Sequence, residues 1–313
     1  MDIKSKINNI VIAGAGVMGA SFAQIFAQYG FKVVLYDIFE ASIEKGKKLI
    51  SMNQQNAIDE GLLTSEESSK LVNNISYTMD MESFRNADFV IEAIAEKMEI
   101  KHEFWKQVSS IAPEDAILTT NTSGLSINKI AEAVHKPERF CGMHWVNPPH
   151  IVPLVEIISG DKTKEETSEI VKELALYIER KPVMVKKDIS GFILNRLQYA
   201  ILREAFYIVE NGVASVEDVD NVMKYGLGRR YACIGPFETI DFGGIDIFFN
   251  VGSYMFKELS NSTEVSPLLR ELYEEGAYGV KTGKGFYDYS GDKAEKAIEK
   301  RDKDFMKVAK ALS

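Results

Sequence analysis

The chain contains 313 residues, of which 45% are hydrophobic and 27% are charged. This composition is typical of folded globular proteins and excludes an intrinsically disordered one, and the length favours two domains. The formal net charge of −9 repels nucleic acids and anionic membranes, so we expect neither as a partner. Two cysteines alone make no disulfide framework, so we expect reduced thiols and a cytoplasmic protein. The two cysteines belong to no cluster with metal-ligand spacing, so no metal site is predicted.

The first 36 residues have the pattern of a strand, a helix and a second strand. Residues 9–13 are a short apolar run, residues 17–29 carry apolar side chains on one helical face, and residues 32–36 form another apolar run. Gly30 supplies a helix stop between the last two segments. This order and length predict a β–α–β unit with parallel strands.

The alternation of strands and helices continues through the first part of the chain. Further strands are predicted at 88–93, 116–119, 139–143, 154–158 and 183–186, and helices at 41–59, 100–110 and 127–134. Such alternation predicts an α/β domain with a Rossmann-type, mostly parallel sheet that helices cover on both faces. We place this domain at residues 1–187.

From Ser190 onward the pattern becomes helical. Helices are predicted at 194–210, 216–224 and 246–259, and the charged tail after Gly291 has spaced apolar residues that suit a final helix. The second domain, residues 188–313, is therefore predicted to be all-helical. Within it, the apolar stretch 240–256 suits either an interface between two copies of the chain or an internal core.

A glycine-rich motif lies between the first predicted strand and the first predicted helix, and it consists of Gly14, Ala15, Gly16, Val17, Met18 and Gly19. In that position glycines permit a tight turn, close approach of the backbone to a pyrophosphate, and close packing of helix on strand. The start of the helix then offers amide groups to phosphates. Asp37 ends the second strand, 18 residues after Gly19, where a carboxylate binds the adenine ribose and repels the extra phosphate of NADP. The pattern predicts an NAD site.

Six short stretches beyond this motif read EAIAE at 92–96, NTS at 121–123, GMHWVNP at 142–148, LVE at 154–156, GFILNR at 191–196 and TGKGFY at 282–287. In sequence and in order they resemble the L-3-hydroxyacyl-CoA dehydrogenase family, over nearly the whole chain up to about residue 289. The resemblance implies an NAD-dependent dehydrogenase and a homodimer formed through the helical domain. It places the active site between the two domains, at the carboxyl ends of the strands.

Oxidation of an alcohol by hydride removal requires a base for the hydroxyl proton, and histidine can accept a proton near neutral pH. The resemblance identifies His144 as this base and Glu156 as its carboxylate partner. A proline-rich turn separates the strand that ends near His144 from the strand 154–158. If the two strands are antiparallel neighbours, His144 and Glu156 lie nearly opposite each other, and Glu156 can hold the orientation of the ring.

The resemblance also implies roles for polar residues around this pair. Ser123 and Asn195 are expected to hydrogen-bond the substrate oxygen as charge develops on it. Positions near the cofactor are implied for Glu96, Lys101, Asn121, Asn147 and Lys281. For Glu96, a place near His144 is the alternative. Family members commonly carry a second serine after the first, where this chain has Gly124.

Two features separate this chain from acyl-CoA members of the family. Those members tend to carry lysines for the CoA phosphates on the helix after the second strand, but here residues 53–61 (NQQNAIDEG) are neutral and then acidic. Lysines at 45, 47 and 48 suit either a phosphate or a solvated helix face. The stretch 226–231, with Arg229 and Arg230, resembles the branch of L-gulonate 3-dehydrogenase and lambda-crystallin. An arginine there can bind a free carboxylate or pair with a surface acid.

Three hypotheses about function remain. The one that we prefer is a dehydrogenase of a free 3-hydroxy acid such as L-gulonate, in which Arg230, or as second choice Arg229, binds the substrate carboxylate. The second is a short-chain L-3-hydroxyacyl-CoA dehydrogenase that acts on 3-hydroxybutyryl-CoA. The third is an NAD-binding structural protein without turnover, as lambda-crystallin is in the lens. The presence of His144, Glu156 and Ser123 argues against the third.

Overall fold

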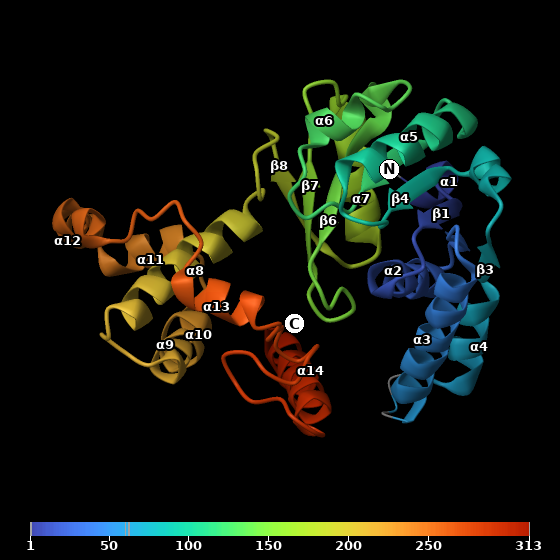
Figure 1. The fold of residues 1–313 in the computed structure, drawn as a ribbon. Helices are drawn as coiled ribbons and strands as arrows, with labels where there is room; N and C mark the ends of the chain where they lie inside the picture. The colour runs from blue at the N-terminus through green and yellow to red at the C-terminus, as the bar shows by residue number, and fades with distance from the viewer. Residues whose placement is uncertain (1, 60, 62, 313) are drawn as a thin grey trace. The chain divides into compact units, whose positions relative to one another are not determined.

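The computed structural model describes residues 2–59, 61 and 63–312, and the chain divides into two units, Met1–Arg196 and Leu197–Ser313. The first unit contains an eight-stranded sheet in the order β3-β2-β1-β4-β5-β6-β7-β8 (Figure 1). Its strands are β1 (Asn9–Ala13), β2 (Lys32–Tyr36), β3 (Ile75–Thr78), β4 (Phe89–Glu92), β5 (Ile117–Thr120), β6 (Phe140–Trp145), β7 (Leu154–Ile158) and β8 (Lys181–Val185).

Neighbouring strands are parallel except at the β6–β7 pair, which is antiparallel. The reversal occurs because a short loop, rather than a helix, connects β6 to β7. This confirms the expectation of a mostly parallel, Rossmann-type sheet. The strand order turns around between β1 and β4, which is the place where open α/β sheets bind ligands.

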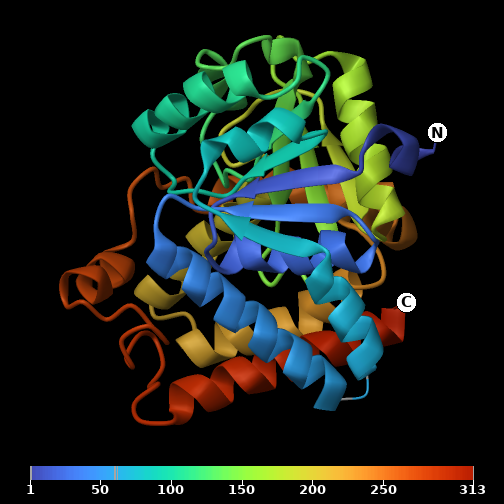
Figure 2. The ribbon, with the colours of Figure 1, turned by 90° about the vertical axis from the view of Figure 1, so that its right-hand side faces the viewer.

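Helices cover both faces of the sheet, as Figure 2 shows. One face packs against α2 (Val17–Gln28), α3 (Glu40–Asp59), α4 (Ser65–Asn73) and α7 (Glu165–Tyr177), and the other against α5 (Met98–Ile111) and α6 (Ile127–Ala131). Successive side chains of β1 point to opposite faces of the sheet. Ile10 and Ile12 pack into the hydrophobic core on the first face, and Val11 packs into the core on the second. Burial on both faces explains why β1 is an unbroken apolar run.

The second unit is helical in its described residues, apart from isolated bridges that Lys284 makes with Gly279 and Asp288. Its helices are α8 (Leu194–Glu210), which begins in the first unit, α9 (Val216–Val222), the π-helical turn η3 (Met223–Leu227), α10 (Gly228–Tyr231), α11 (Pro236–Gly243), α12 (Ile245–Glu258), α13 (Pro267–Glu274) and α14 (Lys293–Leu312). None of its described apolar side chains is fully buried. Among the described residues, no helix is both long and apolar enough to cross a membrane.

The first compact unit ends at Arg196, within the first turn of α8. The reason is local, because the first turn of α8 is bonded to the sheet unit. The amides of Ile193 and Leu194 donate hydrogen bonds to Glu156, and the side-chain amide of Asn195 donates one to the carbonyl oxygen of Ser123. Residues 188–196 therefore belong with the first unit.

Candidate active site

The glycine-rich turn joins β1 to α2, and its glycines have different reasons to be there. Gly14 has φ +102°, and a Cβ on it would lie 2.5 Å from the carbonyl oxygen of Ala93. A Cβ on Gly19 would lie 1.8 Å from the carbonyl oxygen of Gly14, so the close contact of helix and turn requires glycine. A Cβ on Gly16 would meet nothing within 4 Å. The turn is thus packed tightly at Gly14 and Gly19 and open at Gly16, as a pyrophosphate cradle must be.

Val17 and Met18 form the first turn of α2, where backbone amides have no acceptor within the helix. Asp37 follows β2 and closes the same turn. Its carboxylate accepts hydrogen bonds from the amides of Ala15, at 2.8 Å, and Phe39, at 3.0 Å. Carboxylate oxygens have further lone pairs, so these two bonds are compatible with the predicted contact to a ribose. The turn, the helix start and the acid together fit a dinucleotide.

The sequence-predicted histidine and glutamate face each other across the antiparallel β6–β7 pair. His144 and Glu156 are register partners, and Nδ1 of His144 lies 2.8 Å from Oε2 of Glu156. Both are buried, at 5% and 1% exposure. Because a carboxylate accepts at Nδ1, that nitrogen carries the proton, and Nε2 is the ring nitrogen that can act as a base.

Glu156 uses its second carboxylate oxygen to hold the chain at the start of α8. Oε1 accepts hydrogen bonds from the amides of Ile193, at 2.8 Å, and Leu194, at 2.9 Å. Burial alone would raise the pKa of Glu156, but the hydrogen bonds from His144 and from these two amides outweigh it. The pKa of Glu156 is therefore lower than usual, and the side chain is a carboxylate at neutral pH.

Phe192 is a site residue that sequence reasoning missed. It is fully buried, and its ring lies 5.6 Å from the His144 ring, centroid to centroid. Its φ is +50°, a left-handed conformation that is rare for a bulky residue, and Gly191 before it has φ +75°. The two left-handed residues turn the backbone so that Phe192 packs on His144 while the next two amides reach Glu156. Gly191 was the only sequence signal of this turn.

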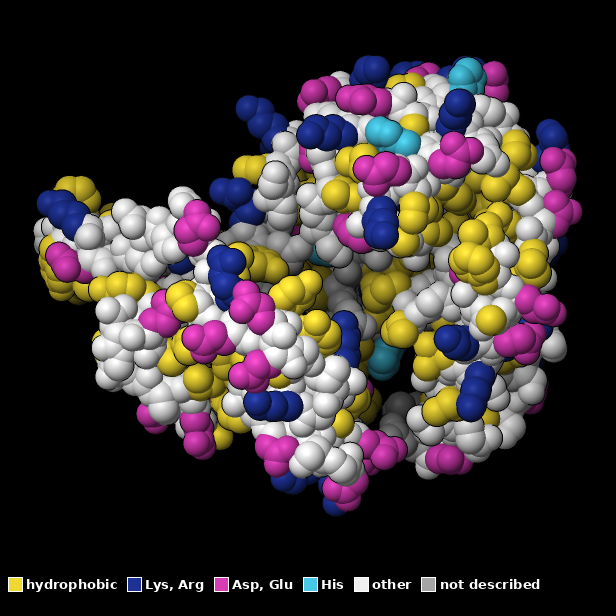
Figure 3. Space-filling view, in the orientation of Figure 1, with side chains coloured by type: hydrophobic (Ala, Val, Ile, Leu, Met, Phe, Trp, Pro, Cys, Tyr) yellow, Lys and Arg dark blue, Asp and Glu magenta, His cyan; other side chains and the backbone are white. Residues whose placement is uncertain are grey.

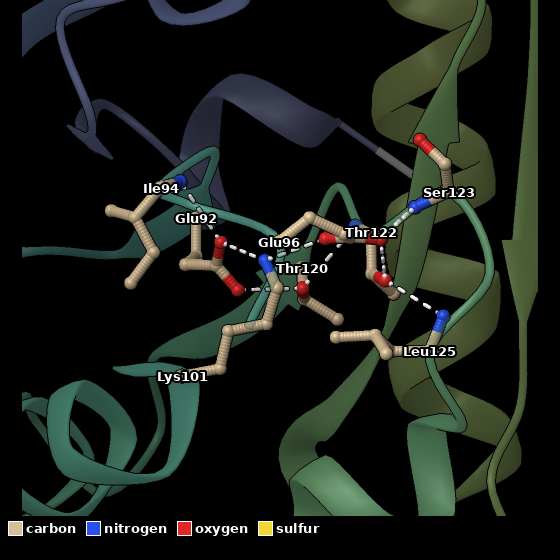
Figure 4. A network of polar contacts seen from close by, with 8 residues as sticks. All are labelled: Glu92, Ile94, Glu96, Lys101, Thr120, Thr122, Ser123 and Leu125. Atoms are coloured by element: carbon tan, nitrogen blue, oxygen red, sulfur yellow. Dashed lines mark hydrogen bonds and ion pairs between the residues drawn. The ribbon is translucent and has the colours of Figure 1, made fainter. Parts of the chain in front are cut away.

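Ser123 lies in the segment after β5, beside a network of charged and polar side chains that Figure 4 shows. Glu96 accepts hydrogen bonds from the Thr122 hydroxyl, at 2.5 Å, and the Ser123 amide, at 2.8 Å. Lys101 donates to Glu92, at 2.5 Å, and its ammonium lies 3.2 Å from Glu96. Glu92, which we did not predict as a site residue, is fully buried.

Charge and hydrogen bonding determine the ionisation of Glu96. Burial raises its pKa, but the hydrogen bonds from Thr122 and Ser123 and the charge of Lys101 lower it by more. The pKa of Glu96 thus lies below its usual value. Asn195 completes the group, because its side-chain amide lies 2.7 Å from the carbonyl oxygen of Ser123. The structure therefore brings together Ser123, Asn195 and Glu96.

The other predicted residues lie in two places. In the first unit, Asn121 accepts a hydrogen bond from the Trp145 amide at 2.9 Å, and Asn147 is exposed in the loop between β6 and β7. In the second unit, Arg229 and Arg230 are exposed on α10, and Lys281 is exposed after α13. The roles of all five with cofactor or substrate stay predictions.

Two family models match the chain. The 3-hydroxyacyl-CoA dehydrogenase NAD binding domain matches residues 9–189, and the 3-hydroxyacyl-CoA dehydrogenase C-terminal domain matches residues 191–289. The chain belongs to the 3-hydroxyacyl-CoA dehydrogenase family. It is accordingly an NAD-dependent dehydrogenase that acts on a CH–OH group. NAD is its cofactor, and the open Gly16 in the turn after β1 suits that cofactor.

Relatives within the 3-hydroxyacyl-CoA dehydrogenase family differ in substrate. The chain is 35% identical to a 5-formyl-3-hydroxy-2-methylpyridine 4-carboxylate 5-dehydrogenase of Mesorhizobium japonicum, over 98% of both chains. A crystal structure of an enzyme of that name, described as an NAD+ dependent dismutase, has a TM-score of 0.89, 35% identity and 98% coverage of both chains. A probable 3-hydroxybutyryl-CoA dehydrogenase of Bacillus subtilis is 39% identical, over 91% of this chain and 98% of the relative.

Replacement of His144 tests the base. We expect His144→Ala to lower turnover by about 10²-fold or more, because no other group then takes the hydroxyl proton, while NAD affinity persists. Glu156→Gln keeps the volume but removes the negative charge beside Nδ1, and we expect a smaller loss of turnover. Steady-state kinetics and NAD titration by calorimetry give the two quantities. Unchanged turnover in His144→Ala would refute the assignment.

A matched pair of glycine variants tests the cofactor turn. Gly16→Ala adds a methyl group where the protein has open space, so the fold should be retained while NAD binding weakens about tenfold or more. Gly19→Ala forces a clash with the Gly14 carbonyl and should lower the free energy of unfolding by about 2 kcal/mol. Thermal denaturation and NAD titration separate the two effects. If Gly16→Ala binds NAD as tightly as the unaltered chain, the pyrophosphate does not lie at Gly16.

Proposed function

We propose that this NAD-dependent dehydrogenase acts on a small free acid whose carboxylate is bound by an arginine, rather than on a CoA thioester. The preferred substrate is a 3-hydroxy acid of the L-gulonate kind. The observation that carries the proposal is the end-to-end similarity to an enzyme named for a pyridine carboxylate. That similarity covers 98% of both chains, whereas the family models end at residue 289. It thus extends into α14, which lies beyond the family models.

The reaction removes a proton and a hydride from the substrate. Nε2 of His144 takes the hydroxyl proton as the carbinol C–H bond breaks and the C=O bond forms. NAD, when bound, supplies the hydride acceptor. Glu156 at Nδ1 stabilises the positive charge that His144 gains. Ser123 and Asn195 hydrogen-bond the substrate oxygen as its charge increases.

The surface of α3 supports a substrate without CoA phosphates. Gln54 is buried and donates a hydrogen bond to Gln24 at 3.0 Å, and Gln55 donates one to Asp59 at 2.8 Å. This part of the helix thus carries amides and an acid instead of cations. Earlier on α3, Lys47 bonds Glu44 at 2.7 Å, so its charge is already paired. Phosphates bind where positive donors gather, and residues 53–61 contain no lysine or arginine.

Arg230 is the preferred group for the substrate carboxylate. Both arginines of α10 are exposed, and Arg229 lies over the ring of Tyr225, 5.5 Å from its centroid. That contact engages Arg229 and favours Arg230 for a bidentate carboxylate bond. The π-helical turn η3 directly precedes α10, and such turns are frequent at functional sites.

A CoA thioester remains the second candidate substrate, because several relatives that are 33–39% identical carry names of 3-hydroxybutyryl-CoA dehydrogenases. They match this chain over 89–92% of its length. In a CoA enzyme of this kind the exposed lysines of α3 would have to supply the phosphate contacts.

A substrate panel decides between the two candidates. We would measure kcat/KM for NADH formation with L-gulonate, 3-hydroxybutyrate, carnitine, 5-formyl-3-hydroxy-2-methylpyridine 4-carboxylate and 3-hydroxybutyryl-CoA. The proposal predicts that a free acid is preferred and that Arg230→Ala raises its KM about tenfold or more. Arg229→Ala, on the same helix, is the matched control. Preference for the CoA thioester would overturn the proposal.

We infer in addition that the protein is a homodimer through α11 and α12. Phe242, Phe249 and Phe256 are 75–80% exposed, and no described apolar side chain of the second unit is fully buried. In Figure 3 apolar side chains lie at the surface of this unit in the region of α11 and α12. Exposed apolar surface of this extent marks an interface, and a second copy of the chain would cover it symmetrically.

Sedimentation velocity tests this interface. Phe249→Asp together with Phe256→Asp would bury charges in the contact, so the sedimentation coefficient should shift toward that of a monomer. Val213→Asp is the control, because Val213 is 71% exposed but lies outside both helices. A dimer that survives the double substitution, or a chain that is a monomer throughout, would contradict the inference.

A further inference from the structure

Glu92 is a buried carboxylate that the proposed mechanism does not use. It ends β4, next to Ala13 at the end of β1, at the point where the strand order turns around. Its side chain is fully buried, and each of its oxygens has a partner. Oε1 accepts from Lys101, at 2.5 Å, and from the Ile94 amide, at 3.0 Å, while Oε2 accepts from the Thr120 hydroxyl, at 2.7 Å.

Lys101 connects Glu92 to the surface of the site. The lysine side chain is 1% exposed, and its ammonium lies between the fully buried Glu92 and Glu96, whose side chain is 44% exposed. Glu96 in turn binds the Thr122 hydroxyl and the Ser123 amide. A continuous path of polar contacts thus leads from the sheet interior to Ser123, as Figure 4 shows.

The path fixes the backbone of the segment that carries Ser123. The Ser123 amide donates to Glu96, the Leu125 amide donates to the Thr122 hydroxyl at 3.0 Å, and the Thr122 amide donates to the Thr120 hydroxyl at 3.3 Å. Side chains, rather than a strand or helix, therefore hold three backbone amides of this segment, those of Thr122, Ser123 and Leu125. A displacement of Glu96 would break the hydrogen bond of the Ser123 amide directly.

Stability alone does not explain this arrangement. Removing charged groups from water is costly, and replacing buried ion pairs with well-packed apolar residues is often neutral or stabilising. The buried pair of Glu92 and Lys101 is better explained by a requirement to hold side chains in fixed positions. We propose that Glu92 is a positioning residue, which holds Lys101 and through it Glu96, so that Ser123 is presented in one fixed orientation. The catalytic consequence rests on the proposed role of Ser123.

Hydrogen exchange measures this positioning without any substrate. In the full-length protein, we expect Glu92→Gln to speed amide exchange in the segment 121–126 about tenfold or more, because Lys101 then loses its stronger partner. Thr119→Val is the matched control. Thr119 is as buried as its neighbour Thr120, but its hydroxyl donates to the Val90 carbonyl at 2.9 Å and does not touch the network. Exchange in 121–126 should not change in this variant.

A double variant separates positioning from simple charge compensation. Glu92→Gln with Lys101→Met leaves no unpaired ammonium, so the melting temperature should recover toward that of the unaltered chain. If Glu92 positions the segment through Lys101, exchange in 121–126 stays fast in the double variant. If exchange slows again together with the recovery in stability, Glu92 only neutralises Lys101, and the proposal is wrong. The double variant also gives the answer if Glu92→Gln alone fails to fold.

Steady-state kinetics of the Glu92→Gln variant test whether the position of Ser123 affects catalysis. With the panel substrate that turns over fastest, Glu92→Gln should lower kcat about tenfold and leave KM within about twofold, because the held groups act in the transition state. Unchanged exchange in Glu92→Gln overturns the positioning role, whatever the substrate is. Fast exchange with unchanged kcat instead shows that Glu92 positions the segment but that Ser123 has no part in catalysis. The two failures are thus distinguishable.

Discussion

The carboxylate of Glu156 is the interaction on which the rest of the candidate site depends. One oxygen binds His144 and the other binds two backbone amides at the start of α8. A carboxylate taken out of water needs several donors to remain charged, and this one has three. The same three hydrogen bonds fix the ring of His144, the proposed base, and the turn that carries Phe192. Loss of Glu156 would therefore alter the ring's protonation, its orientation and the path of the chain after β8 together.

The parallel arrangement of the strands brings the other candidate site residues close together. The turn after β1, Asp37 after β2, Glu92 at the end of β4 and Ser123 after β5 follow the carboxyl ends of neighbouring strands, which lie at one edge of the sheet. The single antiparallel pair then brings Glu156, from the middle of β7, back to His144 near the end of β6. Topology thus gathers residues that are more than a hundred positions apart in sequence.

Much of this could be predicted from the sequence, because the strongest signals are local. Strands β1, β2 and β7 have the bounds that their apolar runs predicted, and the opposition of His144 and Glu156 follows from a short turn between adjacent strands. Helix α7 and the pair α4 and β3 were missed: α4 and β3 are short, and β3 lies at the edge of the sheet, where alternation of apolar residues is weak.

The residues that sequence reasoning missed depend on contacts between distant segments. Phe192 carries no signal of its left-handed backbone, because only the structure shows that Glu156 draws the next two amides toward β7. Glu92 lies near the end of the predicted apolar strand 88–93. Nothing nearby in the sequence reveals that Lys101, a full turn into α5, contacts it. The periodicity of apolar residues predicts which face of a strand or helix is buried. It does not predict which charged side chains from different elements form pairs.

The charges of the network around Lys101 also bear on the proposed recognition of a free acid. Lys101 is the cation nearest to Ser123 along the polar path, yet its ammonium is already shared by Glu92 and Glu96. Two carboxylates outweigh one ammonium, so the network offers no excess positive charge to a carboxylate or a phosphate. Asp37 adds another negative group at the same edge of the sheet.

In a chain with a formal net charge of −9, attraction for an acid must then come from cations that are not already paired. The arginines of α10 are exposed, whereas Lys47 of α3 is paired with Glu44. If the substrate is the proposed free acid, its carboxylate therefore needs a cation outside this network, and Arg230 is the candidate that we propose.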